Sequence, residues 1–186
     1  VADYVLSKTP GNTVSNLSST RALRDVTNNH NGSYEASAVG EVNVVDKMKA
    51  TNAIIGGEGN GGVIYPEMHY GRDALIGVAL FLTQLAERKI SAKTLRDSYP
   101  NYFISKNKIQ LTPEIDVDAI LTTLEEKYKN EQITTIDGLK IDFQEGWVHL
   151  RKSNTEPIIR IYAESEGEEK ANKFANDMIN EIKELI

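Results

Sequence analysis

The pattern of strands and helices changes near residues 97–101, and this change constrains the fold more than any other feature. Before it, short apolar segments typical of strands alternate with segments whose apolar residues have helical spacing. After it, most strand segments follow one another directly. Alternation indicates layered α/β architecture, and consecutive strands indicate an antiparallel sheet. We therefore predict an α/β layered domain with a mixed sheet at 1–100. A smaller α+β domain with an antiparallel sheet and two helices is predicted at 101–186.

The first half is expected to place its strands and helices in alternation. Ser18 and Ser19 are candidate N-caps for the first helix. The helix over 73–88 is apolar on most faces, so we expect it to be buried between the sheet and neighbouring structure. The expected strands are 13–17, a short one near 34, 53–55 and 63–65. Three helices are expected: one from the candidate caps to about 28, one over 41–49 and one over 73–88.

The second half begins with a strand and a helix and continues with consecutive strands. Asp116 is a candidate cap for the helix, and Asp137-Gly138 is a strong hairpin signal. A last helix is expected from about Glu168. The expected strands are 102–111, 133–136, 139–143, 147–150 and 158–163.

Composition narrows the class of protein. The chain has 186 residues, of which 40% are hydrophobic, enough for one large or two small domains. No apolar run is long enough to span a bilayer, and the first residues do not resemble a signal peptide. The net charge of −6 argues against a general nucleic-acid or membrane binder. The chain has no cysteine, which excludes disulfides and fits a cytoplasmic protein.

A short polar loop between two expected strands is a candidate anion site. It carries Arg151, Lys152, Ser153, Asn154 and Thr155. A guanidinium offers a two-pronged donor, hydroxyls donate, and the backbone N–H groups of a turn can surround an oxyanion. An ordinary hairpin loop explains the same composition, because Ser, Asn and Thr favour turns for local reasons.

A glycine-rich loop over 56–62 is a candidate site for hydroxyl groups. Glu58 is its one carboxylate, suited to accept hydrogen bonds from sugar hydroxyls, and Asn60 adds an amide. A hairpin whose Asn60-Gly61 pair makes the turn is the alternative. That alternative accounts less well for the four other glycines, because glycines in strands are costly without a reason.

Together the two loops resemble motifs of one family. The run from Arg151 to Arg160, RKSNTEPIIR, resembles the phosphate-binding loop of the last domain of the α-D-phosphohexomutases. The run from Gly57 to Gly62, GEGNGG, resembles the sugar-binding loop of that family's third domain. The motifs have the family's order and separation, and the resemblance covers essentially the whole chain. The phosphoglucosamine mutase and phosphomannomutase branches look most similar.

The resemblance implies roles for particular residues. Arg151, Ser153, Asn154 and Thr155 match the phosphate-binding positions, whereas Lys152 stands where the family varies. Glu58 and Asn60 match the positions that hold sugar hydroxyls. Two positions depart from the family: Ser18 and Glu41 stand where some members have basic residues, and no phosphate role is assigned to them.

The resemblance also implies parts that this chain does not carry. The family transfers a phosphoryl group from a phosphoserine, with Mg²⁺ held by an Asp-rich loop, and neither sequence run occurs here. We therefore expect a C-terminal half that recognises hexose 1- and 6-phosphates, with no catalytic residue and no metal ligand of its own. Its expected partners are a phosphosugar and the N-terminal domains of the parent enzyme.

Other interpretations stay open at this point. The chain could be a stand-alone phosphosugar-binding module, or a pair of structural domains whose loops bind nothing. The hexose cannot be identified from Glu58 and Asn60, since they serve hydroxyls common to several sugars. The sequence assigns no role to His69, Arg72 or His149.

Overall fold

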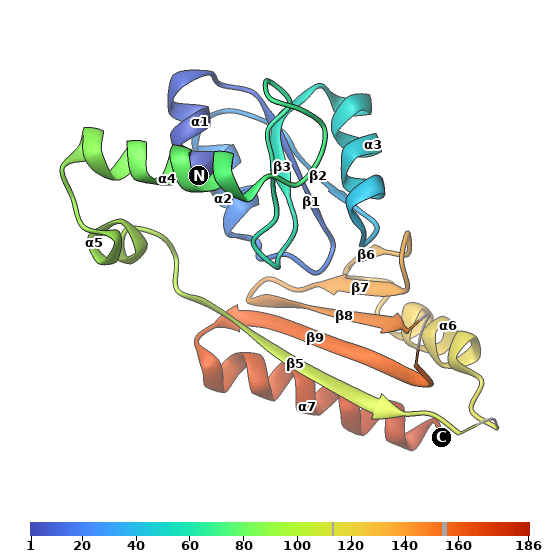
Figure 1. Cartoon of the computed structure of the whole chain (residues 1–186). Helices are drawn as coiled ribbons and strands as arrows, with labels where there is room; N and C mark the ends of the chain where they lie inside the picture. Colours follow the sequence, from blue (N-terminus) through green and yellow to red (C-terminus); the bar gives the residue numbers. More distant parts are fainter. Residues whose placement is uncertain (113, 154–155) are drawn as a thin grey trace. The chain divides into compact units, whose positions relative to one another are not determined.

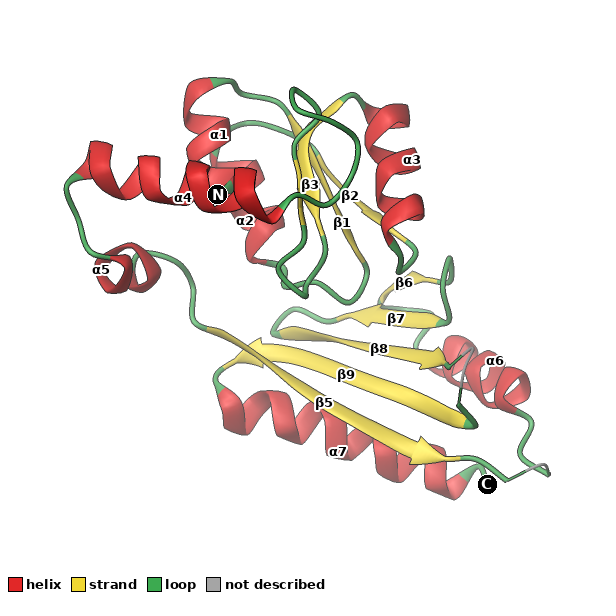
Figure 2. Cartoon of the chain, in the orientation of Figure 1, coloured by secondary structure: helices red, strands yellow, loops and turns green. Residues whose placement is uncertain are grey.

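The computed structural model describes residues 1–112, 114–153 and 156–186. The chain consists of two compact units, Val1–Pro100 and Asn101–Ile186. Each unit contains one sheet with helices packed on it, as Figures 1 and 2 show.

The first unit contains a mixed sheet of four strands in the order β2-β1-β3-β4. Its interior strand β1 pairs in parallel with β2 and β3, whereas β3 pairs antiparallel with β4. The predicted α/β class with a mixed sheet is confirmed. The strands are β1 (Asn12–Asn16), β2 (Tyr34–Ser37), β3 (Ala53–Gly57) and β4 (Val63–Ile64).

Helices cover both faces of this sheet. In Figure 1, α3 lies on one side of the strands, and α1 and α2 lie on the other. Val44 and Met48 of α3 pack with Val14 and Ile64 of the sheet in a buried core. The helices of this unit are α1 (Ala2–Lys8), α2 (Ala22–Asn29), α3 (Glu41–Thr51), α4 (Ala74–Arg88) and α5 (Ala92–Asp97).

Two expectations for the first unit were wrong. Ser18 and Ser19 do not cap a helix, since α2 begins three residues later with Arg21 at its N-cap position. The Ser19 hydroxyl instead donates to Asn16 Oδ1 over 2.9 Å. Helix α4 is not buried on most faces, because the side chains of Leu75, Val78 and Leu82 are exposed to solvent, Leu75 to 82%.

The second unit contains a five-stranded sheet in the order β5-β9-β8-β7-β6, with every pair antiparallel. Asp116 caps α6 by accepting two backbone N–H bonds, as predicted. The α+β class with two helices is confirmed. The elements are β5 (Tyr102–Gln110), α6 (Val117–Lys127), β6 (Gln132–Thr134), β7 (Leu139–Asp142), β8 (Gly146–Lys152), β9 (Ile158–Glu166) and α7 (Glu168–Glu184).

The two faces of this second sheet differ in chemistry. One face carries Leu150 and Ile161, which pack with α6 and α7 in the main core. Because side chains alternate along a strand, the intervening residues His149 and Arg151 lie on the opposite face.

No helix in the described part of the chain is both long and apolar enough to cross a membrane.

Candidate functional site

The loop at residues 58–62 closes a hairpin between β3 and β4. The Glu58 N–H donates to the Gly62 carbonyl over 2.9 Å, and the Gly61 N–H donates to the Glu58 carbonyl over 3.1 Å. Asn60 Oδ1 accepts the Gly62 N–H over 3.0 Å, and Gly61 has a φ of +92°. The hairpin interpretation therefore explains Asn60-Gly61. The Asn60 residue itself is exposed to solvent.

The other glycines of this loop make room for the protein's own chain. A Cβ on Gly57 would collide with the Gly62 carbonyl oxygen, and a Cβ on Gly62 would lie 2.6 Å from Arg72 Cδ. Side chains at these positions would therefore displace the hairpin or Arg72. The glycines have a structural reason, and they do not by themselves indicate a ligand.

The Glu58 carboxylate is held on both oxygens. Its side chain is only 6% exposed, with Oε2 lying 3.2 Å from Arg72 Nη1. Oε1 accepts from Asn16 Nδ2 over 3.0 Å. Asn16 is itself oriented, because its Oδ1 accepts the Ser18 N–H and the Ser19 hydroxyl. Glu58 thus has a fixed position at the carboxyl ends of β1 and β3.

Arg72 joins Glu58 to a second carboxylate. Its Nε lies 2.8 Å from Glu41 Oε2, and its backbone N–H donates to Glu41 Oε1 over 2.9 Å. These bonds, the backbone one first, lower the pKa of Glu41. Two carboxylates around one guanidinium give a cluster of net negative charge. Such a cluster suits hydroxyl donors better than a phosphate dianion.

Arg72 does not pair with its neighbour Asp73. The Asp73 carboxylate lies 3.1 Å from His69 Nε2 and also caps α4. Bonds to the Ile76 N–H and then to His69 lower the pKa of Asp73. His69 is therefore a partner of the helix cap, whereas Arg72 contacts Glu58 of the loop.

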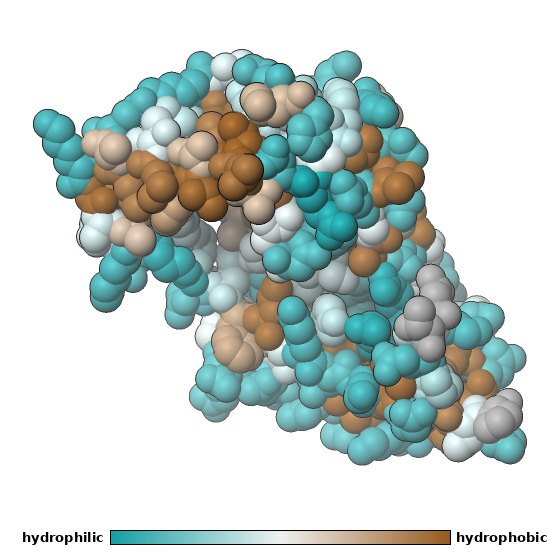
Figure 3. All heavy atoms as spheres, in the orientation of Figure 1, coloured by the Kyte–Doolittle hydropathy of each residue, from teal (hydrophilic) through white to brown (hydrophobic). Residues whose placement is uncertain are grey.

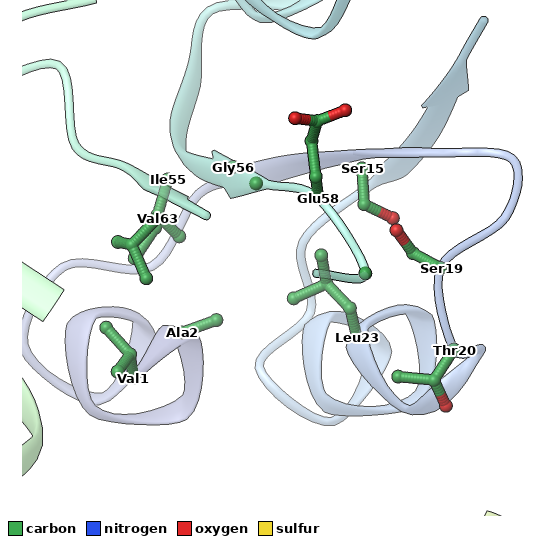
Figure 4. Close-up of a pocket in the computed structure, with 12 residues that line it drawn as sticks. Val1, Ala2, Ser15, Ser19, Thr20, Leu23, Ile55, Gly56, Glu58 and Val63 are labelled. Atoms are coloured by element: carbon green, nitrogen blue, oxygen red, sulfur yellow. The ribbon is translucent and has the colours of Figure 1, made fainter. Parts of the chain in front are cut away.

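A small cavity of about 150 Å³ lies beside the hairpin. Figure 4 shows Val1, Ala2, Leu23 and Val63 around it, and the Glu58 carboxylate points away from Val1, Ala2 and Leu23. The acceptor atoms of Glu58 thus face the side of Asn16 and Arg72. The apolar cavity does not suit a phosphosugar.

The second loop joins β8 to β9. Arg151 lies near the end of β8 with its side chain 23% exposed, and its Nη1 is 3.3 Å from Asp137 Oδ2. Ser153 is buried, and its N–H donates to the Ile158 carbonyl over 3.0 Å. The predicted phosphate-binding residues Asn154 and Thr155 lie outside the described residues.

Three cations lie in one row across the strands beside this loop. Arg151 of β8 is the register partner of Arg160 of β9, and Arg160 is the register partner of Lys108 of β5. Directly opposed residues of antiparallel strands share a face, and like charges in that arrangement destabilise the sheet. Glu156 offsets part of this charge, lying 3.2 Å from Arg160 Nη2. Arg160 Nε has no hydrogen-bond partner among the described residues.

His149 lies two residues before Arg151 and is also directed to the turn at Asp137. Its Nε2 lies 2.7 Å from the Asp137 carbonyl oxygen. Because a carbonyl only accepts, Nε2 carries the proton and Nδ1 does not. Burial lowers the pKa of His149 to about 4, against a weaker raising effect of the Asp137 bond. His149 is neutral at pH 7 and braces the strand that carries Arg151.

Sequence reasoning missed three of these groups. Asn16 orients Glu58 from a distant strand, and no local motif marked it. Arg160 and Lys108 join Arg151 only through strand register. Arg160 does close the run that begins at Arg151, so its place in that motif was the one available signal.

A metal site is not found in the part of the chain that the structure describes. Residues 1–112, 114–153 and 156–186 contain no group of three or more His, Cys, Asp or Glu that could hold a metal ion. The clustered carboxylates Glu41 and Glu58 are already paired with Arg72. The described residues therefore do not fit a magnesium site.

The chain thus combines an α/β layered unit and an α+β unit, each with a polar loop. Residues 1–102 match the model of phosphoglucomutase/phosphomannomutase, alpha/beta/alpha domain III. Residues 108–181 match the model of the C-terminal domain of the same proteins. The chain belongs to the phosphoglucomutase/phosphomannomutase family.

Individual relatives agree with this assignment. The phosphoglucosamine/phosphogalactosamine mutase of Sulfurisphaera tokodaii is 36% identical over 93% of this chain and 38% of its own length. The phosphoglucomutase/phosphomannomutase of Thermococcus kodakarensis is 35% identical over 100% of this chain and 41% of its own length. The chain thus spans about two fifths of these relatives.

A solved structure shows the same fold. The phosphoglucomutase/phosphomannomutase family protein of Burkholderia thailandensis superimposes with a TM-score of 0.78 and 24% identity. The match covers 98% of this chain and 39% of that one. At this identity the likeness concerns the fold alone.

Proposed function

We propose that this chain is the substrate-recognition half of a phosphohexomutase, an isomerase that interconverts hexose 1-phosphates and 6-phosphates. The parent enzyme is proposed to act on phosphoglucosamine or phosphomannose substrates. The observation that carries the proposal is the row of Arg151, Arg160 and Lys108 beside the β8–β9 loop. Opposed cations on one sheet face are stabilised by a bound dianion.

The phosphate group is assigned to the second unit. Arg151 offers a guanidinium fork, Ser153 contributes from the start of the loop, and Asn154 and Thr155 complete the proposed set. His149 is proposed to position Arg151 and to take no proton from the substrate, since it is neutral and buried. Arg160 is proposed to share the phosphate charge.

The sugar hydroxyls are assigned to the first unit. Glu58 accepts from hydroxyls, and the exposed Asn60 amide offers a donor at the loop tip. Because both Glu58 oxygens are already occupied, a sugar adds to the second lone pairs or displaces Arg72. The contacts with Asn16 and Arg72 fix the Glu58 side chain in the ligand-free protein, which lowers the entropy cost of binding the sugar.

The phosphoryl transfer itself is assigned to parts outside this chain. The parent is proposed to use Mg²⁺ and a phosphoserine from its N-terminal domains, and we assign no metal step to the described residues. We expect the isolated chain to turn over no hexose phosphate, with or without Mg²⁺. A stand-alone phosphosugar-binding module is the second candidate. It is favoured by Glu58, because both oxygens of this carboxylate are paired with residues of this chain.

Calorimetric titration of the 186-residue chain with glucosamine 6-phosphate, mannose 6-phosphate and the unphosphorylated sugars tests the proposal. Weak but measurable binding of the phosphosugars, and none of the free sugars, is expected. A coupled assay for isomerised product is the companion measurement. Product above background would assign chemistry to this chain, and equal heats for phosphorylated and free sugars would remove the phosphate site.

A further inference from the structure

Arg72 presents part of its guanidinium to solvent beside the glycine-rich loop. Its side chain is 46% exposed, although Nε contacts Glu41 and Nη1 contacts Glu58. A guanidinium has five N–H donors in one plane, and these two contacts engage only some of them. In Figure 3, apolar side chains (brown) gather over α4, and hydrophilic ones (teal) cover the adjoining surface toward α3. The guanidinium therefore has donors left for a ligand that comes from solvent.

The position of Arg72 is fixed by the backbone around it. Arg72 forms an isolated bridge with Ile64 of β4, and the next residue, Asp73, donates its N–H to the Val63 carbonyl over 2.8 Å. Gly62 leaves room for the stem of the arginine, since a Cβ there would lie 2.6 Å from Arg72 Cδ. A ligand at this loop therefore meets a donor that is already in place.

Glu41 keeps Arg72 in this position when a ligand reaches Glu58. The two Glu41 oxygens accept from the Arg72 backbone N–H over 2.9 Å and from Nε over 2.8 Å. The contact between Arg72 Nη1 and Glu58 Oε2 is longer, at 3.2 Å. A ligand can therefore bind at the longer contact while both bonds to Glu41 persist.

Glu58 and Arg72 place a hydrogen-bond acceptor and a donor side by side. The 3.2 Å between Glu58 Oε2 and Arg72 Nη1 is close to the separation of two neighbouring hydroxyl oxygens on a sugar ring. A hydroxyl both donates and accepts, so one hydroxyl can donate to the carboxylate while its neighbour accepts from the guanidinium. A phosphate group would instead be repelled by both Glu41 and Glu58.

We propose that Arg72 is a specificity-determining residue, which donates to one ring hydroxyl of the sugar while Glu58 accepts from the adjacent one. The inference rests on the proposed sugar-binding role of Glu58 and adds to it a residue from outside the glycine-rich loop. Both hydrogen bonds involve a charged group, which makes them stronger than bonds between neutral groups. The pair selects sugars that carry both hydroxyls on neighbouring carbons.

Ligand analogues that each lack one ring hydroxyl test this pairing. Arg72→Lys keeps the positive charge but replaces the planar fork of donors by a point charge. The 186-residue chain and its variants are titrated by NMR with mannose 6-phosphate, its deoxy analogues and inorganic phosphate. Arg88→Lys is the matched control, because Arg88 is similarly exposed (41%) and pairs with Asp3 at the far end of α4.

We expect Arg72→Lys to weaken the binding of mannose 6-phosphate roughly tenfold, because one hydrogen bond from a charged group is lost. This loss should disappear for the analogue that lacks one particular hydroxyl, since Arg72 then has no hydroxyl to bind. The loss caused by Glu58→Gln should disappear for the analogue that lacks the adjacent hydroxyl. Arg88→Lys should leave every affinity unchanged.

A purely structural role for Arg72 would give a different pattern. The inference is overturned if Arg72→Lys changes no affinity, weakens every analogue by the same factor, or weakens inorganic phosphate as much as the sugar phosphate. A hydroxyl-dependent loss for Glu58→Gln alone would also overturn it, but would leave the proposed sugar role of Glu58 intact. If the unchanged chain binds neither mannose 6-phosphate nor any analogue, the proposed function fails and the inference fails with it.

Discussion

The two proposed binding loops differ in how their charged groups are paired. In the first unit, Glu58 is satisfied by Asn16 and Arg72 before any ligand arrives. In the second unit, Arg151 and Arg160 oppose one another on neighbouring strands. Asp137 and Glu156 offset part of their charge, and Arg160 Nε has no hydrogen-bond partner among the described residues. The carboxylate of the first loop is thus paired on both oxygens, whereas the row beside the second loop keeps positive charge that the proposed phosphate would neutralise.

This difference concerns energetics as well as geometry. A pre-ordered acceptor loses little conformational entropy on binding and discriminates among hydroxyl positions. A row of like charges weakens the free protein and strengthens its complex with an anion. We therefore expect most of the affinity to come from the second unit and most of the sugar selectivity to come from the first.

A drop in pH should produce the largest difference between the two units in their free energy of unfolding. The unfolded chain takes up a proton on His149 below about pH 6.5, whereas the folded pKa is about 4. The free energy of unfolding of the second unit should therefore fall by about 3 kcal/mol as the pH drops through this window. Trp147 is the chain's one tryptophan and lies in β8, so its fluorescence in urea reports the second unit.

The first unit should respond only at lower pH. Its carboxylates Asp3, Glu41 and Asp73 have lowered pKa values, so their stabilising contribution is lost only as the pH falls below their ordinary range. His149→Gln is the matched variant and should remove the pH dependence of the second unit. An unchanged slope between pH 6.5 and 4 in that variant would assign the effect to other groups.

Removing the principal guanidinium should have the next largest effect. Arg151→Ala should weaken phosphosugar binding by roughly 1.5–3 kcal/mol, the range for hydrogen bonds to a charged group. Lys152→Ala, at the exposed neighbouring position, should change affinity little and serves as the control. Equal titration curves for Arg151→Ala and the unchanged chain would remove Arg151 from the site.

The smallest expected effect concerns the opposed cations. Arg160→Gln should stabilise the ligand-free second unit by roughly 0.2–1 kcal/mol, since it removes a like-charge pair. Added phosphate should stabilise the Arg160→Gln variant less than it stabilises the unchanged chain. Urea titrations with and without phosphate measure both signs. A variant that is destabilised without phosphate, or that gains as much from it, would show that the row is not an anion site.

The general architecture followed from the sequence, because period and turn chemistry are local. Asp116 at its helix cap and Gly138 in its hairpin behave as their residue types predict. Helix α5 was not predicted, because its six residues, Ala92–Asp97, are too few to show a helical spacing of apolar residues. The burial of α4 was predicted wrongly, because an apolar sequence does not show which faces of a helix other residues cover.

The candidate residues could be named from motifs, but their partners could not. Asn16 and Glu41 meet the loop through the fold, at separations that no local pattern encodes. Arg160 and Lys108 join Arg151 through strand register, which depends on how β5, β8 and β9 pair. The sites named from resemblance remain predictions, and Asn154 and Thr155 lie outside the described residues.

The most direct test crosses two variants with two ligands. Glu58→Gln keeps the size of the side chain and removes its charge. By calorimetry, Glu58→Gln should weaken a hexose phosphate and leave inorganic phosphate nearly unchanged, whereas Arg151→Ala should weaken both. That result would place sugar recognition in the first unit and phosphate recognition in the second. If each variant weakens both ligands equally, or neither, the division between the two loops is contradicted.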